Sequence, residues 1–302
     1  MDKKEKCVYL VGRPPINDFL SFMLTQTVDA QDLDTGLLTQ EWREANDRVK
    51  EIQGAESGFC DNHAITAIPE NLQPLLEKVK QDEIMKKSFS YIPYEFGMVD
   101  LDKLIVFQKF INLGHIERIK EGISKDMTDE KIFELCMPFN HPVPNFNVQR
   151  ISPNAFDFVS RSNDLRFLEA RSFKKEEVIN YNPQGVIAGI IGLVVGYGSN
   201  YLNALSVNNR LILNNGSHRA YALKDLGKKF VPCLIQRVSR VEELEFAGQQ
   251  VQQFVINQAQ NVRPPALKDY FDDKLRKIVF LSEKARHVRI SFSTEGIDLP
   301  LS

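Results

Sequence analysis

The side chains best suited to chemistry lie in one short loop of the sequence, Asn214-Asn215-Gly216-Ser217-His218-Arg219. An apolar stretch over residues 210–213 predicts a strand before this loop, and a helical pattern follows it through Leu226. The N-terminus of a helix presents unpaired backbone N–H groups and about half a positive charge, which together attract an anion. The order strand, tight loop, helix therefore predicts an anion site.

Each side chain of the loop suits a phosphate group. Gly216 allows close approach of the backbone, and Ser217 can cap the helix or bond a phosphate oxygen. Arg219 offers a planar fork of donors, and His218 adds a further donor. We expect Asn215, Gly216, Ser217, His218 and Arg219 to hold the phosphates of a nucleotide, with Ser217 and His218 as candidate catalytic residues. The alternative is a simple capped helix start in which Arg219 pairs with a carboxylate.

The residues around the loop resemble a known family. The loop is followed by Ala220-Tyr221-Ala222-Leu223, Leu226-Gly227 and Val231-Pro232. Together these resemble the Gly-x-His-Arg signature of the ParB/sulfiredoxin superfamily. The resemblance implies an α+β fold with a ParB/sulfiredoxin-like core and a bound nucleotide (ATP, ADP or CTP) with Mg²⁺. In that superfamily the matching loop grips ATP in sulfiredoxins, CTP in ParB proteins and ADP in free-serine kinases.

Two departures from the family pattern limit what the resemblance implies. Ser217 stands where sulfiredoxins carry their catalytic cysteine, and a hydroxyl is a far poorer nucleophile than a thiolate at neutral pH. His218 replaces the first arginine of the ParB pair, and no convincing helix-turn-helix follows. The resemblance is strongest over residues 200–235, and 99–123 is its expected opening strand and helix, with Gln108 at a position that is often polar. The function it implies is a nucleotide-dependent phosphotransferase or hydrolase, with a DNA-associated binding module or nuclease as the alternative.

Composition adds few constraints. The 302 residues are 43% hydrophobic and 26% charged, with a net charge of −2, so no global field favours nucleic acid. Four widely spaced cysteines show no metal-binding pattern, as expected of reduced thiols. The longest apolar run, 186–195, is far shorter than the roughly 20 residues needed to cross a bilayer. We expect a cytoplasmic protein with no membrane partner; DNA stays open as a partner.

We expect three regions along the chain: a mainly helical N-terminal extension over 1–90, the core over 91–240, and a C-terminal helix and strand over 241–302. The first region begins with a strand at 7–12 and contains two amphipathic helices, one through Leu38, Trp42, Ala45 and Val49 and one through Leu72 to Val79.

The core pattern predicts a helix at 115–123, an irregular loop at 137–147, and two hairpins. The first hairpin joins 156–159 to 165–170, and the second joins 204–207 to 210–213 through Asn208-Asn209. The run 186–195 is a buried helix or a strand. Strands at 230–235 and 288–292 and a helix at 243–258 complete the expectation.

Weaker candidates come from single residues or short groups. Gly196-Tyr197-Gly198 could form a second phosphate cradle, although a turn is the simpler interpretation. Asp100, Asp102 and Glu95 could act as a base or hold a metal, and His141 could belong to a lid; His115 is expected on an exposed helix face. Positive charge gathers near the C-terminus and suggests a nucleic-acid contact or a solvated mixed face; its residues are Lys268, Lys274, Arg276, Lys277, Lys284, Arg286, His287 and Arg289.

Overall fold

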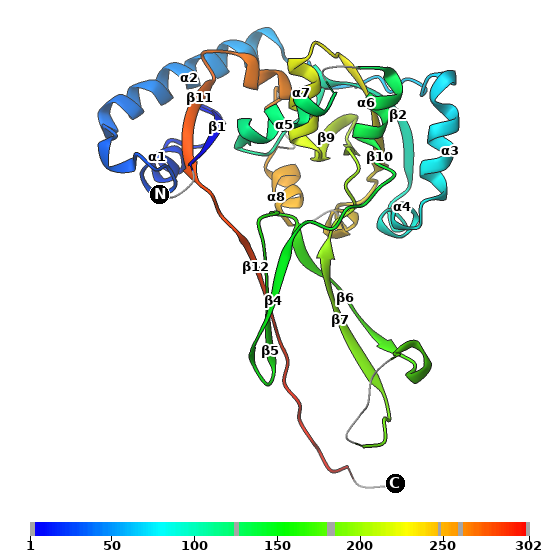
Figure 1. The fold of residues 1–302 in the computed structure, drawn as a ribbon. Coiled ribbons are helices and arrows are strands. Elements are labelled where there is room, and N and C mark those ends of the chain that lie inside the picture. The colour runs from blue at the N-terminus through cyan, green and yellow to red at the C-terminus, as the bar shows by residue number, and fades with distance from the viewer. Residues whose placement is uncertain (1–3, 124–126, 180–184, 247–248, 259–261, 300–302) are drawn as a thin grey trace. The chain divides into compact units, whose positions relative to one another are not determined.

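A computed structural model of the chain describes residues 4–123, 127–179, 185–246, 249–258 and 262–299. It is a mixed α+β protein, as the sequence predicts (Figure 1). The chain divides into two compact units: unit 1 comprises Met1–Asn140 and Asn200–Glu283, and unit 2 comprises His141–Ser199 and Lys284–Ser302. The boundaries expected near residues 90 and 240 do not coincide with this division, because the N-terminal helices and the loop at 214–219 share unit 1.

Unit 1 contains the α-helices of the described chain. They are α1 (Ile16–Gln26), α2 (Thr35–Ala55), α3 (Gln73–Gln81), α4 (Glu83–Ser88), α5 (Leu113–Ile123), α6 (Asp129–Cys136), α7 (Ser217–Asp225) and α8 (Gln249–Gln258). The two expected amphipathic helices are confirmed as α2 and α3, and Pro74 lies in the first turn of α3, where a missing N–H costs nothing. The expected helix over 243–258 corresponds to α8 and to a short 3₁₀ turn at Val241–Phe246, which begins two residues earlier than expected.

Two sheets organise unit 1. The first has the order β11-β1-β3, with β1 (Lys4–Leu10) between β11 (Arg276–Ser282) and β3 (Phe110–Asn112). The second has the order β2-β10-β8-β9, formed by β2 (Tyr94–Asp100), β10 (Phe230–Arg237), β8 (Asn203–Val207) and β9 (Arg210–Asn215). In it β8 and β10 are parallel, as expected of strands joined by a helical crossover.

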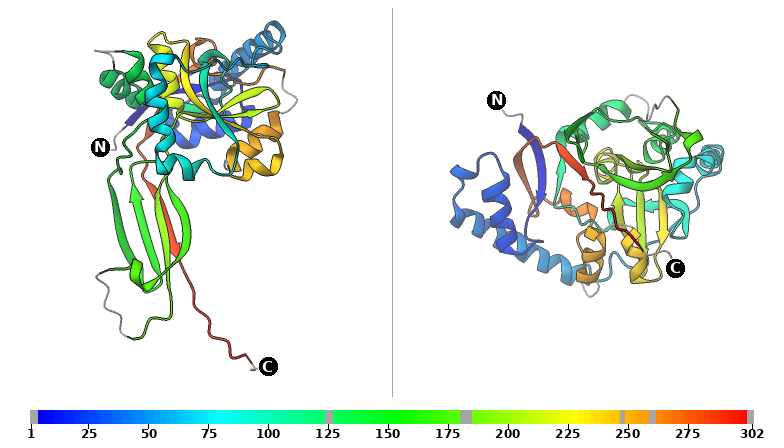
Figure 2. Two further views of the ribbon diagram at one scale, coloured as in Figure 1. Left: turned by 90° about the vertical axis from the view of Figure 1, so that its right-hand side faces the viewer. Right: turned by 90° about the horizontal axis from the view of Figure 1, so that it is seen from below.

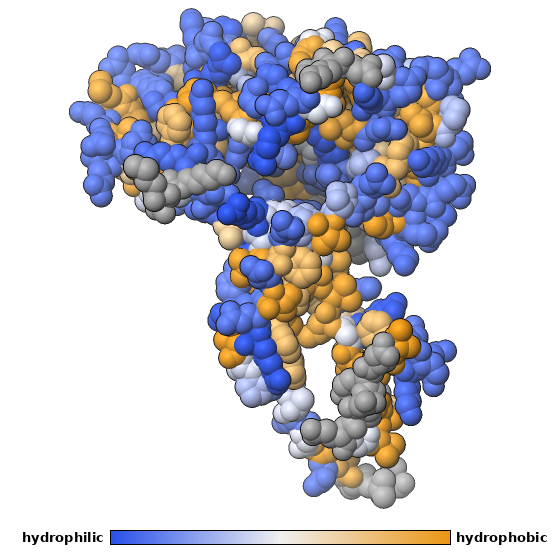
Figure 3. All heavy atoms as spheres, in the orientation of Figure 1, coloured by the Kyte–Doolittle hydropathy of each residue, from blue (hydrophilic) through white to orange (hydrophobic). Residues whose placement is uncertain are grey.

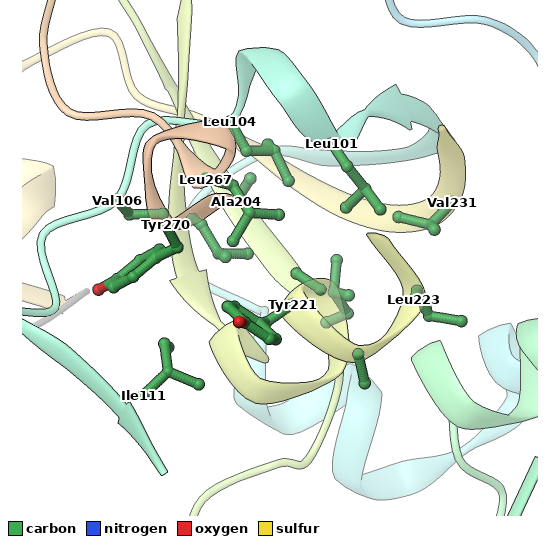
Figure 4. Close-up of a cluster of buried hydrophobic side chains, with 14 of the residues drawn as sticks. Leu101, Leu104, Val106, Ile111, Ala204, Tyr221, Leu223, Val231, Leu267 and Tyr270 are labelled. Atoms are coloured by element: carbon green, nitrogen blue, oxygen red, sulfur yellow. The ribbon is translucent and has the colours of Figure 1, made fainter. Parts of the chain in front are cut away.

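The hairpin of β8 and β9 is confirmed, and its second strand leads directly into the loop at 214–219. Asn208 and Asn209 both have positive φ, at 49° and 62°, as a tight two-residue turn requires. β9 then runs into Gly216 and α7, whose inner face enters the main core. Figure 4 shows Tyr221 of α7 among side chains from both sheets and from the segment at 267–270, and Leu223 of the same helix is also buried. The loop therefore lies between two buried elements, β9 and α7.

Unit 2 is built from β-strands. β4 (Phe146–Ser152), β5 (Ala155–Ser160) and β12 (Arg286–Ser291) form an antiparallel sheet in the order β12-β5-β4, and β6 (Leu165–Phe173) pairs only with β7 (Ile190–Tyr197) within the described residues (Figures 1 and 2). The expected hairpin between 156–159 and 165–170 is wrong. Both segments are strands, but β5 pairs with β4 and β12, whereas β6 pairs with β7.

The same strands settle the ambiguous apolar run. It contains the larger part of β7, so it is a strand rather than a helix. The expected strand at 288–292 is confirmed as β12. Over the residues the model describes, no helix combines the length and the apolar character needed to cross a membrane.

Candidate functional site

The loop at 214–219 has the backbone geometry of an open helix start. Gly216 is the N-cap residue of α7 and adopts a left-handed conformation with φ of 95°, which suits glycine. A Cβ at this position would lie 3.1 Å from Cγ and 3.2 Å from Cα of Leu202. Because Gly216 has no side chain, no side-chain cap accepts from the N–H groups of the first helical turn. These donors are left for water or a ligand.

Ser217 adds a hydroxyl to these amides. Ser217 is the first residue of α7, and its exposed fraction is 5%. Its hydroxyl therefore belongs to the same uncapped first turn, and a hydroxyl can donate to a phosphate oxygen. The amide nitrogen of the nearby Asn214 instead donates to Oδ1 of Asn203 at 3.0 Å.

His218 is held as a neutral ring. Its Nε2 accepts a hydrogen bond from the backbone N–H of Asn112 at 3.1 Å, so the proton of the neutral ring lies on Nδ1. Burial, with smaller contributions from His115 and Arg219, lowers the pKa of His218 to about 4. At neutral pH this residue is therefore an uncharged donor through Nδ1–H rather than a cation.

A second helix begins beside the loop. Asn112 precedes α5, and its Oδ1 accepts from the backbone N–H of His115 at 3.0 Å, so it caps this helix. The rings of His115 and His218 meet edge to face with centroids 5.0 Å apart. The N-terminal ends of α5 and α7 thus lie together, and their dipoles add at the same place. His115 is exposed, as expected, and its pKa is lowered by partial burial and by the nearby Arg118 and Arg219.

Asn112 and His115 are site residues that sequence reasoning missed. The sequence pattern places His115 on an exposed face without a role and does not single out Asn112. The signal was present in the sequence, because an asparagine just before a helical pattern is a typical N-cap residue. That pattern alone could not show that the second helix begins beside the loop.

Arg219 differs from the expected phosphate fork. Its exposed fraction is 7%, and its NH1 nitrogen donates to the carbonyl oxygens of Leu135 at 3.1 Å and Asn200 at 2.6 Å. Leu135 belongs to the last turn of α6, where carbonyl groups carry partial negative charge. No carboxylate in the described part of the chain pairs with Arg219, and burial lowers its pKa. NH1 therefore ties α7 to α6, while the charge of the guanidinium lies behind the loop.

The three carboxylates considered as a base or metal ligand, Asp100, Asp102 and Glu95, each bind another group of the protein. Asp102 forms an ion pair with Lys224, and Oδ1 of Asp100 accepts from the backbone N–H of Asp102. Glu95 pairs with Arg237 at 2.6 Å. Among the residues that the model covers, no three His, Cys, Asp or Glu side chains gather as a metal site would require.

The second glycine-rich candidate lies in unit 2 and is already occupied. The N–H of Gly198 donates to Oδ2 of Asp164 at 2.8 Å, so a carboxylate of the protein holds the position that a phosphate would take. His141, the suggested lid residue, is the first residue of unit 2 and is half-buried.

The basic residues near the C-terminus are divided between the two units. Lys268 and Lys277 in unit 1 pair with Glu56 and Glu41, both at 2.7 Å. Others lie in unit 2, where Arg289 and His287 both contact Asp157. Neutralised pairs offer little to a nucleic-acid backbone, which favours the solvated mixed face.

Two cavities of about 270 Å³ each are present in unit 1, and neither is lined by a residue of 214–219. One lies at the turn of the β8–β9 hairpin, beside the ion pair of Arg210 and Asp61, which measures 2.5 Å. The other lies where α6 meets the start of β10. An anion at the loop would bind outside both cavities.

The chain matches no protein-family model, and no curated protein or solved structure matches it either. The ParB/sulfiredoxin resemblance therefore stays an expectation that rests on the loop residues themselves.

Proposed function

We propose that unit 1 binds a nucleotide through its phosphates at the loop Asn215–Arg219. The observation that carries this proposal is the group of donors at the start of α7: the uncapped amides of the first turn, with the hydroxyl of Ser217 on the first helical residue. His218, the second residue of α7, has a further donor in Nδ1–H, since its Nε2 accepts from Asn112. Convergent donors of this kind suit the oxygens of a phosphate group.

Electrostatics support an anion at this place. The charge of Arg219 has no carboxylate partner in the described part of the chain, and its NH2 nitrogen lies 3.1 Å from where a Cβ on Gly216 would be. A buried cation without a counter-ion raises the positive potential of the loop in front of it. The paired N-termini of α5 and α7 raise it further. Arg219 then acts from behind the loop through its charge rather than as a forked ligand.

The geometry favours binding over turnover. His218 is neutral at pH 7 and its Nε2 already accepts from a backbone amide, so it makes a poor general acid or base. No carboxylate among the described residues is hydrogen-bonded to His115 or His218. We therefore assign Ser217 and His218 to phosphate binding. Any Mg²⁺ would be held by the nucleotide's own phosphates, since carboxylates are the protein ligands that it prefers.

The test is a thermal-shift screen of the purified chain with ATP, ADP, CTP and GTP, each with and without Mg²⁺, and with tripolyphosphate. A ligand that binds only the folded state stabilises it by about 2.7 kcal/mol at a hundredfold excess over Kd. We expect at least one nucleotide, and tripolyphosphate more weakly, to raise Tm. Product analysis of the same mixtures checks for turnover, which we do not expect.

Two substitutions of one residue separate the donor of His218 from its acceptor. His218→Asn keeps a donor near the Nδ1 position, whereas His218→Gln keeps an acceptor near the Nε2 position. We expect the Gln variant to lose more nucleotide affinity than the Asn variant, by about tenfold. Lys229→Ala, an exposed change at the second cavity, is the matched control and should bind as wild type.

Unchanged affinity in both His218 variants would overturn the proposal, as would the absence of any response to nucleotides and tripolyphosphate. Binding of duplex DNA with a steep salt dependence, in a protein indifferent to nucleotides, would favour the DNA-associated alternative instead.

A further inference from the structure

Unit 2 has no hydrophobic core of its own among the residues described. Both clusters of buried hydrophobic side chains consist of unit 1 residues. Unit 2 nevertheless carries more than half of the exposed large hydrophobic residues of the described chain. Figure 3 shows such residues gathered along its strands. Apolar surface on this scale marks an interaction site.

The ribbon of β6 and β7 has one face without any charged side chain. Register places Leu165 opposite Tyr197, Phe167 opposite Val195, and Ala170 opposite Leu193. Side chains of a strand alternate between faces, so these residues share one face with Ile191. Leu165 at one end of this face is only 2% exposed, whereas Phe167, Leu193 and Ile191 are 46%, 40% and 76% exposed. The opposite face carries Arg166, Glu169 and Arg171, so the ribbon is amphipathic. A ribbon of two strands is marginally stable in water unless its apolar face is covered.

The free edges of unit 2 differ in their protection against pairing. β4 carries Arg150 and a register irregularity, β6 carries charged residues and a bulge between Phe167 and Glu169, and β12 carries Arg286 and Arg289. Charges and bulges are the usual devices that keep an edge strand from pairing with another chain. β7, with the sequence IIGLVVGY, is the one described strand of unit 2 without a charged residue, and it also lacks proline.

We propose that β7 pairs with β7 of a second copy of this chain, antiparallel and about a twofold axis. A strand that pairs with itself meets its own residues, so a charge near its centre would face a like charge; β7 has none. A twofold axis perpendicular to the ribbon joins two ribbons into a sheet in the order β6-β7-β7-β6. Both uncharged faces then lie on one side. Four strands exceed the number that an isolated sheet needs for stability.

Charge also argues against a lipid surface as the occupant. Beyond β6, the chain continues with Lys174 and Lys175 followed at once by Glu176 and Glu177, so its charges balance. Segments that bind anionic membranes carry an excess of Lys and Arg. A second copy of this chain presents the same uncharged β7, which can pair with the first β7.

The oligomeric state of the full chain tests the proposal, measured by sedimentation equilibrium. We expect a dimer at about 10 µM. Val194→Lys should weaken the dimer by at least about tenfold, because two lysines would meet near the centre of the pairing. Within one ribbon the new lysine lies opposite Glu169, so the ribbon itself is not expected to unfold. Val148→Lys on β4, a half-exposed position in an edge strand, is the matched control and should leave the dimer intact.

Cross-linking provides a second readout that does not depend on stability. Cys7, Cys60, Cys136 and Cys233 are all buried, so an introduced surface cysteine is the accessible thiol. A short bis-maleimide should link Val194→Cys into covalent dimers and should not link Val148→Cys. A wild-type chain that stays monomeric at about 10 µM would overturn the proposal, and so would dimers that link through Val148→Cys. A monomer that floats with phosphatidylcholine vesicles would also overturn it and would identify lipid as the occupant.

Discussion

Arg263 and Arg219 are both buried in unit 1, but only Arg263 has carboxylate partners. Arg263 is fully buried and donates to Asp269 at 2.7 Å and to Glu56 at 2.9 Å. Burial lowers the pKa of Arg263, but the two carboxylates raise it by more. The pKa of Arg263 therefore lies above its ordinary value. Arg219 meets only carbonyl oxygens and thiols, and its pKa is lowered.

The difference distinguishes a structural charge from one that is available to a ligand. The carboxylates around Arg263 balance its charge, so it attracts nothing more. Carbonyl dipoles satisfy the hydrogen bonds of Arg219 without cancelling its charge, which leaves positive potential at the loop. If this comparison is right, the first arginine matters to stability alone and the second matters to stability and to anion binding.

The largest loss of stability is expected from removing Asp269, the carboxylate that balances the charge of Arg263. Asp269 accepts from Arg263 and from Arg13, and its exposed fraction is 1%. Asp269→Ala leaves two buried guanidinium groups without this carboxylate, so we expect the free energy of unfolding to fall by about 3–5 kcal/mol. Urea denaturation monitored by circular dichroism measures it.

The matched control for Asp269→Ala is Glu51→Ala, which removes an exposed carboxylate from Arg48 on α2. An exposed pair contributes about 0–1 kcal/mol, so this variant should unfold nearly as wild type does. Equal losses in the two variants would contradict the view that Asp269 balances buried charge.

The next effect concerns Arg219. Arg219→Met keeps much of the side-chain length but removes the donors to Leu135 and Asn200, and we expect a loss of about 2 kcal/mol in the free energy of unfolding. We also expect tripolyphosphate to lose most of its stabilising effect on this variant, because the charge behind the loop is gone. Thermal shift with and without tripolyphosphate measures both quantities.

Asp269→Ala is the control for Arg219→Met in this assay. We expect Asp269→Ala to be less stable than Arg219→Met, but it keeps Arg219. It should still respond to tripolyphosphate as wild type does, provided that it is assayed below its Tm. If Arg219→Met responds fully as well, the uncompensated charge does not contribute to binding, and the comparison of the two arginines fails.

A smaller effect is expected from pH. Burial lowers the pKa of His218 and of His63 to about 4 each; Nε2 of His63 accepts from the backbone N–H of Asp100, and its Nδ1 is buried without a partner in the described structure. Because the unfolded chain takes up these protons near pH 6.5 and the folded one only near pH 4, the unfolded state binds more protons between these values. Stability is therefore full above pH 6.5 and falls as the pH falls toward 4.

We expect a loss of about 2 kcal/mol between pH 7 and pH 5 for the two histidines together, after allowing for partial exposure. Urea denaturation at the two pH values measures it, and His63→Phe should flatten the dependence. A stability that does not change over this range would contradict the neutral, hydrogen-bonded state that we assign to His218.

The local geometry of the loop could be predicted from sequence, but its surroundings could not. The pattern of 210–226 identifies strand, glycine and helix because these follow from neighbouring residues. The partners of Arg219 on α6 are more than 80 residues away, and Asn112 is more than 100 residues from His218. No local pattern carries such contacts.

The error at 156–170 has the same origin. Both segments alternate as strands do, and the short turn between them fits a hairpin. Their actual partners include β12, about 130 residues after β5 in the sequence, and β7. Strand propensity is local, whereas strand pairing is decided by which edges and faces the rest of the chain supplies.

The smallest effect separates the backbone requirement of the loop from its ligand requirement. Gly227 and Gly216 both have positive φ, at 82° and 95°, but a Cβ on Gly227 meets nothing within 4 Å. Gly227→Ala should therefore cost only the backbone strain, about 1 kcal/mol, and leave nucleotide affinity unchanged. Gly216→Ala adds close contacts with Leu202 and with NH2 of Arg219, so it should cost more and, because it displaces the charge behind the loop, reduce affinity as well. Calorimetric unfolding and nucleotide titration of the two variants measure both effects. If Gly216→Ala behaved like Gly227→Ala in both measurements, the loop would need glycine for its turn alone, and the anion would have to bind elsewhere.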